Sequence, residues 1–237
     1  MIVCLFLAKV TNLNKRIVVW ITLPEYHKAN ITRQNPQGKT MSSHETKALT
    51  NELKLQGAIL GGFVALIWVL EIIDQVIPGR TLDGFGIHPR QISGLWGILF
   101  APFLHVSIAH VAANTIPFVA LGWLVMLRDI RDFFFVTFVA MTIGGLGTWV
   151  FGATGNHIGA SGVIFGYLGY LMLRGFFERS IPAIAFSLLV FFLYGGLLWG
   201  VLPLQRGISW EGHLFGYVGG VVAAYILSKH HRERQVT

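Results

Sequence analysis

A serine between small residues stands at the start of an apolar segment of membrane length. Ser161 lies in the Gly-Ala-Ser-Gly run of residues 159–162, and apolar residues continue to Phe177. A hydroxyl at bilayer depth needs a polar partner or water, because lipid supplies neither. The other polar side chains near ends of apolar segments are His105, His110, Asn114 and His213. Serine, histidine and asparagine together suit nucleophile, base and oxyanion donors in acyl transfer. The alternative is a small-residue contact between membrane helices.

The spacing of these residues predicts which of them share a helix face. His110 and Asn114 are four residues apart and therefore lie on one face of a helix. His105 precedes His110 by five residues, so we expect it to point elsewhere and to have a supporting, structural or interfacial role. The side-chain amide of Asn114, a ring N–H of His110 and the backbone N–H of Ser161 are candidate oxyanion donors.

Two glycine stripes predict that the serine and the last histidine come close together. One stripe contains Gly162, Gly166 and Gly169, and the other shares a face with the base candidate: His213, Gly216 and Gly220. Helices with facing glycines can approach closely enough for a serine to bond a histidine. Glu211 is two residues from His213 and points to another face, so the pattern indicates a Ser–His dyad without an acid.

The composition indicates a membrane protein with several spans. Hydrophobic residues make up 54% of the 237 residues and charged residues only 12%, far fewer than in a soluble globule. The net charge of +7 fits basic loops that face a cytoplasm, and no nucleic-acid motif accompanies it. Cys4 is the only cysteine, which excludes an intrachain disulfide and a cysteine metal site.

Six apolar segments must position these residues in an all-α membrane bundle. They cover about 57–77, 102–127, 133–151, 161–177, 181–202 and 210–228. The mixed connection 78–99 predicts an outer loop that is partly inserted in the membrane. Glu71 and Asp74 lie near the far end of the first segment, where we expect interfacial water to solvate them; the alternative is a functional role for acids inside the membrane.

Polar ends flank this predicted six-helix domain of residues 57–228. Residues 1–56 are interpreted as a disordered cytoplasmic tail, with Met41 as a hypothetical true start that would make residues 1–40 non-native. Residues 229–237 form a basic tail. Lys and Arg are concentrated on the side of both termini, which predicts that both are cytoplasmic. Ser161, His110, Asn114 and His213 then all lie in the outer half of the membrane.

The motifs, taken in order, resemble those of the rhomboid family of intramembrane serine proteases. They are His105-x4-His110-x3-Asn114, Gly159-Ala160-Ser161-Gly162 and His213-x2-Gly216-x3-Gly220. The resemblance implies the bacterial six-helix fold in a plasma membrane. It also implies cleavage of transmembrane protein substrates in or near the lipid bilayer, without metal or cofactor. The family's nucleophile and base correspond to Ser161 and His213, and its oxyanion donors to His110, Asn114 and the Ser161 N–H.

Two positions depart from the family pattern. A Trp-Arg pair in the first outer loop is replaced by Trp96-Gly97, which puts the anchoring of that loop in question. The family's Tyr four residues after the serine is Phe165, whose ring can still stack on the base.

Three other functions are compatible with parts of the sequence. A non-catalytic relative would bind transmembrane helices without needing Ser161 and His213. A transporter would place polar groups through the whole membrane depth, whereas here they lie in the outer half. A histidine metal site lacks a nearby acid and leaves Ser161 without a role. The oligomeric state and the substrate are not indicated by any motif.

Overall fold

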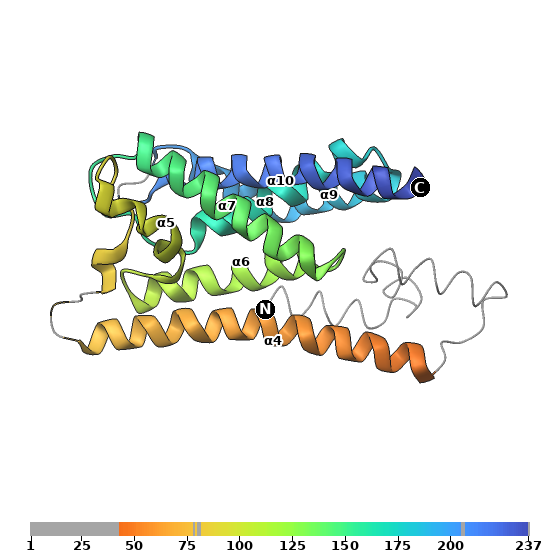
Figure 1. Ribbon diagram of the computed structural model, residues 1–237, viewed down its shortest axis with the longest axis horizontal. Coiled ribbons are helices and arrows are strands. Elements are labelled where there is room, and N and C mark those ends of the chain that lie inside the picture. Colours follow the sequence, from red (N-terminus) through yellow and green to blue (C-terminus); the bar gives the residue numbers. More distant parts are fainter. Residues whose placement is uncertain (1–42, 78, 80–81, 205–206, 237) are drawn as a thin grey trace.

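The protein is an all-α helical bundle. The computed structural model describes residues 43–77, 79, 82–204 and 207–236, and this part of the chain contains helices and one isolated bridge but no strand. Its longer helices are α4 (Ser43–Val76), α6 (Ile108–Met126), α7 (Ile130–Phe151), α8 (Ser161–Glu178), α9 (Ile181–Tyr194) and α10 (Trp210–Val236) (Figure 1). The predicted fold class is confirmed.

Helix α8 is the centre of the bundle. It contacts α6, α7, α9 and α10, and its middle, from Val163 to Leu171, is buried. Helix α4 packs beside α6 at the edge of the bundle (Figure 1). Ser161 therefore begins the most enclosed helix of the protein.

Four helical segments are long and apolar enough to cross a membrane. They are Thr46–Val76, Ile108–Met126, Ile130–Phe151 and Ile181–Val201. Helices α8 and α10 are less apolar because glycine, tyrosine and histidine replace many aliphatic residues. Such residues suit a helix whose neighbours are other helices, since it needs no continuous lipid-facing surface. The count of six spans stays a prediction.

The first helix begins well before the predicted domain boundary. Residues 43–56, which we interpreted as part of a disordered tail, are helical as the start of α4. Their polar composition argued against membrane burial, but residues 48–56 are mostly good helix formers, and the apolar helix that follows nucleates them. Gln56 is buried and accepts a hydrogen bond from Trp123 Nε1 (3.0 Å), so the packed body includes it. Residues 1–42, with the hypothetical start at Met41, lie outside the described residues.

The connection between α4 and α6 is built from short helical turns. They are η1 (Leu82–Phe85), η2 (Ile92–Leu95), α5 (Gly97–Phe100) and η3 (Ala101–Phe103). The turns expose Ile92 and Trp96, which suits the predicted partial insertion without testing it. Helix α6 begins at Ile108, later than predicted, because the extended Leu104 ends the η3 turn and Ser107 caps the new helix.

Two acids near the end of α4 are buried. The expectation that water solvates Glu71 and Asp74 is wrong, because each is only 2% exposed. Asp74 Oδ1 accepts from the backbone N–H of Leu82 (2.8 Å), so it joins the end of α4 to the outer loop. Glu71 Oε1 accepts from Gln75 Nε2 (2.6 Å), a residue one turn away on the same helix.

The outer loop between α4 and α6 is anchored by an arginine that the sequence pattern did not identify. Arg90 Nη1 donates hydrogen bonds to the carbonyls of Val150 (3.2 Å) and Gly152 (2.8 Å) at the end of α7. A Cβ at Gly97 would collide with the backbone of Gly86, so an arginine at position 97 could not be accommodated without a backbone shift. Arg90 thus supplies the anchoring that Gly97 had put in question.

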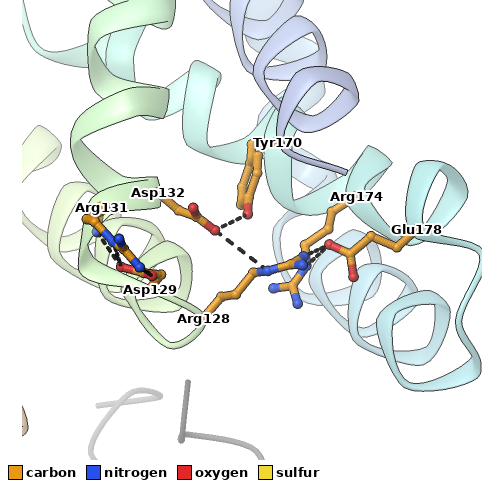
Figure 2. A network of polar contacts seen from close by, with 7 residues as sticks. All are labelled: Arg128, Asp129, Arg131, Asp132, Tyr170, Arg174 and Glu178. Carbon is orange, nitrogen blue, oxygen red and sulfur yellow. Dashed lines mark hydrogen bonds and ion pairs between the residues drawn. The ribbon is translucent and has the colours of Figure 1, made fainter. Parts of the chain in front are cut away.

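A buried ionic network ties α7 and the turn between α6 and α7 to the end of α8 opposite Ser161 (Figure 2). Glu178 Oε1 accepts from Arg174 Nε (2.6 Å) and pairs with Arg128 Nη1. Asp132 Oδ2 lies 3.7 Å from Arg128 Nε and accepts a hydrogen bond from Tyr170 (3.2 Å). The Arg128 and Asp132 side chains are each 5% exposed, so neither charge is compensated by bulk water.

Glu178→Gln is expected to destabilise the protein by about 3 kcal/mol, because it leaves two arginines facing a neutral amide in a buried site. Arg131→Ala is the matched control. It removes an exposed ion pair with Asp129, whose expected contribution is about 0–1 kcal/mol. Denaturant unfolding in detergent measures both variants. An equal loss of unfolding free energy in Glu178→Gln and Arg131→Ala would contradict a stabilising role of the buried network.

Candidate active site

Ser161 and His213 are brought into hydrogen-bond contact. Ser161 is the first residue of α8, and His213 lies in the first turn of α10. The serine Oγ is 2.8 Å from His213 Nε2. Two residues that are far apart in the chain meet because their helices begin at the same end of the bundle. This is the pairing that the sequence predicted.

The second ring nitrogen of His213 determines which proton the imidazole carries. Nδ1 lies 2.8 Å from the carbonyl oxygen of Gly200 in η4 (Gly195–Val201). A carbonyl only accepts, so Nδ1 carries the hydrogen in a neutral imidazole. The lone pair is then on Nε2, where it can accept the proton of the Ser161 hydroxyl.

The ring of Phe165 stacks on His213, as expected for this position. The ring centroids are 4.2 Å apart and the planes differ by 9°. Gly200 lies against both rings, since a Cβ there would be 2.8 Å from Phe165 Cζ and 3.3 Å from His213 Nδ1. The imidazole is therefore held by stacking and by one carbonyl, and a larger residue at position 200 would displace it.

Glu211 has a different role from that of a triad acid. Its Oε1 accepts a hydrogen bond from the backbone N–H of Ala153 (2.9 Å) in the loop before α8. The prediction that it points to another helix face than His213 is consistent with this contact. It fixes the loop that leads to Ser161.

His110 and Asn114 lie beside the backbone that leads into Ser161. Gly159 has a φ of +124°, and a Cβ there would be 2.9 Å from His110 Cε1 and 3.8 Å from Asn114 Nδ2. Only glycine fits this close approach without strain. Asn114 Nδ2 and His110 Nδ1 are buried and have no hydrogen-bond partner among the described residues. Asn114 can thus donate its amide N–H to a bound group.

His105 lies closer to the site than its spacing suggested. Its ring packs edge-on against His110 with centroids 5.0 Å apart, and its Nε2 accepts from the Ala160 N–H (3.4 Å). The expectation that it points elsewhere is wrong, because His105 precedes α6 and helical spacing does not apply to it. Its supporting role stays a prediction.

The two glycine stripes pack against each other. A Cβ at Gly216 would collide with the carbonyl oxygen of Gly162, and one at Gly220 would collide with that of Gly166. The close approach of α8 and α10 is what lets the short Ser161 side chain reach His213.

Gly220→Ala is expected to cost about 1–3 kcal/mol, because a methyl group must displace the backbone of α8. The same change should impair the Ser161–His213 contact two turns away. Gly61→Ala is the control, since a Cβ there meets nothing within 4 Å. Thermal unfolding and substrate turnover are compared. A Gly220→Ala protein as stable and active as Gly61→Ala would contradict the packing account.

A small cavity of about 50 Å³ lies beside Ser161. Its lining includes Gly144, Gly145, Thr148, His157 and Ser209. The ring of His157 links two sides of this cavity through hydrogen bonds. Its Nδ1 is hydrogen-bonded to Ser209 Oγ (2.7 Å), and its Nε2 to the carbonyl oxygen of Ala153 (2.9 Å). His157 is thus a partnered structural histidine, and the cavity offers space for a group next to the serine.

Three contributors to the site were not predicted from the sequence. Gly200 orients His213 through its carbonyl, Arg90 anchors the outer loop, and Ser209 joins α10 to His157. The glycines at positions 195, 196 and 200 could have indicated that the fifth apolar segment changes from an α-helix to a 3₁₀ helix. Within the described ranges, no three His, Cys, Asp or Glu side chains gather as metal ligands would, so the metal alternative gains no support.

Comparison with known proteins identifies the family. Residues 93–230 match the Rhomboid domain. The chain belongs to the rhomboid family. The matched range contains every predicted site residue, from His105 to Gly220. The resemblance stated from the motifs is confirmed, and the rhomboid chain is an integral membrane protein.

Named relatives include both uncharacterized proteins and proteases. The uncharacterized protein Rv1337 of Mycobacterium tuberculosis is 43% identical over 86% of this chain and 87% of its own length. Rhomboid protease GluP of Bacillus subtilis is 30% identical over 69% of this chain and 33% of its own length. RHOMBOID-like protein 1 of Arabidopsis thaliana is 26% identical over 59% of this chain and 36% of its own length.

Proposed function

We propose that this rhomboid protein is an intramembrane serine endopeptidase that uses Ser161 and His213. The observation that carries the proposal is the 2.8 Å contact between Ser161 Oγ and His213 Nε2, with Nδ1 held by the Gly200 carbonyl. This arrangement fixes the tautomer that a general base needs. A relative named as a rhomboid protease adds support.

In the proposed reaction, Ser161 Oγ attacks the scissile carbonyl while His213 Nε2 takes the hydroxyl proton. The resulting oxyanion accepts hydrogen bonds from the Asn114 amide, the His110 ring and the Ser161 N–H. His213 then donates its proton to the leaving amine as the C–N bond breaks, which leaves an acyl-enzyme. Water, deprotonated by His213, attacks the ester carbonyl. The bond between that carbon and Ser161 Oγ then breaks, and His213 returns the proton to Oγ as the acid product leaves.

The substrate class follows from the membrane setting. The serine lies at the end of a bundle of apolar helices, so a substrate reaches it from the lipid bilayer or from the adjacent water. A transmembrane helix hides its carbonyls in its own hydrogen bonds and must unwind locally before attack. The proposed substrates are therefore membrane proteins whose helices unwind easily near the active-site side.

Helix α9 is the proposed side of substrate access. Its main contacts are with α8 and the following turn η4, and most of its apolar side chains face outward. Cysteine pairs that tether α9 to α6 should slow cleavage. Unchanged turnover after verified cross-linking would exclude this route.

We propose that both termini face the cytoplasm of a bacterial plasma membrane, because the basic residues are concentrated on the side of the termini. Ser161, at the opposite end of α8 from the ionic network, then faces the outer side.

The proposed function is tested with the full chain in liposomes that contain a single-span protein substrate. We expect a peptide bond in or beside the span to be cleaved, with products identified by mass spectrometry, and Ser161→Ala to abolish cleavage. Capture of the substrate helix without any cleavage would favour the helix-binding alternative. Cleavage that persists in Ser161→Ala would assign the activity to another residue or a contaminant.

A further inference from the structure

Ser209 lies immediately before α10, the helix that carries the candidate base. Its carbonyl oxygen accepts a hydrogen bond from the backbone N–H of His213 (3.2 Å), and its Oγ accepts one from the backbone N–H of Gly212 (3.4 Å). A serine that bonds the backbone in this way is an N-cap, which stabilises the first turn of a helix. Ser209 therefore holds the turn in which His213 lies.

The hydroxyl of Ser209 also binds His157, and the direction of that hydrogen bond is defined. His157 Nε2 lies 2.9 Å from the carbonyl oxygen of Ala153, which only accepts. In a neutral imidazole Nε2 therefore carries the hydrogen, and Nδ1 accepts the hydrogen bond from the Ser209 hydroxyl (2.7 Å). Because this hydroxyl donates to His157 and accepts from Gly212, one side chain joins the histidine ring to the start of α10.

His157 is fixed to the outer loop by its own backbone. Its N–H donates to the carbonyl oxygen of Ile87, and its carbonyl oxygen accepts from the N–H of Ile87 (3.0 Å each). The ring thus extends from a backbone bridge that does not involve α10. Through Ser209, the start of α10 is attached to this bridge.

A second contact joins the same two segments. Glu211 Oε1, in the first turn of α10, accepts from the Ala153 N–H (2.9 Å). The loop that leads to Ser161 is therefore attached twice to the turn that carries His213. The glycine stripes set the distance between α8 and α10, whereas these two contacts act on the first turn itself, where helices fray.

We propose that His157 and Ser209 are positioning residues that hold His213 Nε2 within hydrogen-bond reach of Ser161. They act on the base through the backbone of the first α10 turn, not on the scissile bond. The required precision is high, because a misplacement of about 1 Å in a catalytic constellation can cost about 10²-fold in rate. The inference rests on the proposed function.

The test compares Ser209→Gly, Ser209→Thr and His157→Ala with the double variant Ser209→Gly/His157→Ala in the liposome cleavage assay. Glycine is a tolerated N-cap that lacks the hydroxyl, whereas threonine keeps both the cap and the donor. We expect Ser209→Gly and His157→Ala each to lower kcat about tenfold with KM unchanged, since the Glu211 contact remains. Ser209→Thr should retain most of the activity. The double variant should be no slower than the slower single variant, because both changes break the same link.

The rate at which a fluorophosphonate probe labels Ser161 is a second readout, which does not depend on binding of the substrate. It should fall by the same factor as kcat in Ser209→Gly and His157→Ala. Asn156→Ala is the matched control in the same loop. It removes a hydrogen bond with the Asp83 carbonyl (2.6 Å) and leaves the link to α10 in place, so kcat and the labelling rate should stay at the wild-type level.

A lower unfolding temperature in Ser209→Gly and His157→Ala, with kcat and labelling rate as in the wild type, would assign the pair a structural role and overturn the inference. Multiplicative losses in the double variant, or a Ser209→Thr protein as slow as Ser209→Gly, would overturn it as well. In each case a wild type that cleaves and is labelled at Ser161 leaves the proposed function intact. A wild type that neither cleaves nor is labelled would overturn the proposed function and the positioning role with it.

Discussion

Replacing His213 with alanine is expected to reduce cleavage by about 10⁴-fold or more, and Ser161→Ala should have an effect of the same order. In the proposed mechanism the two residues act as a unit, because a serine is a weak nucleophile until a base such as Nε2 removes its proton. The double variant should therefore be no slower than either single variant. The measurement is kcat with a transmembrane substrate in liposomes.

Controls for these variants lie outside the site. Ser228→Ala removes a hydroxyl that bonds the Tyr225 carbonyl near the other end of α10, and His88→Ala removes a histidine of the outer loop. Both should retain most of the activity. If Ser161→Ala and His213→Ala lost activity in proportion to a loss of folded protein, the dyad would not be supported.

Asn114→Ala is expected to lower kcat by about 10²–10³ with little change in KM, because its amide would serve the oxyanion and not the ground-state substrate. Its Nδ2 is buried without a partner among the described residues, so the loss of a structural hydrogen bond does not explain such an effect. Thr115→Val, one position further along α6, removes the hydrogen bond with Trp68 and serves as the control. A rise in KM at constant kcat would assign Asn114 to substrate binding instead.

Local periodicity made much of the site predictable. The four-residue spacing of His110 and Asn114 predicted that they share one helix face, and both lie beside Gly159. The facing glycines of α8 and α10 predicted the approach that joins Ser161 to His213. These features depend on helical geometry, which a sequence displays directly. The all-α fold was predictable for the same reason, whereas the rhomboid family was predicted from the resemblance of three motifs.

Features that depend on irregular backbone could not be predicted. The Gly200 carbonyl that orients His213 exists because the fifth apolar segment changes from α to 3₁₀ geometry after Tyr194. His105 meets His110 because it lies before α6 and not on it. Arg90 anchors the outer loop through carbonyls of α7 that are distant in the chain. Such contacts are set by tertiary packing, which spacing does not reveal.

The most direct test is labelling of the folded, detergent-solubilised protein with a fluorophosphonate probe, followed by mass spectrometry of the modified peptide. The account predicts a covalent adduct on Ser161 that is absent in both Ser161→Ala and His213→Ala. Wild-type protein that is shown to be folded and yet is not labelled, or labelling of another serine that persists in His213→Ala, would contradict an activated Ser161–His213 dyad.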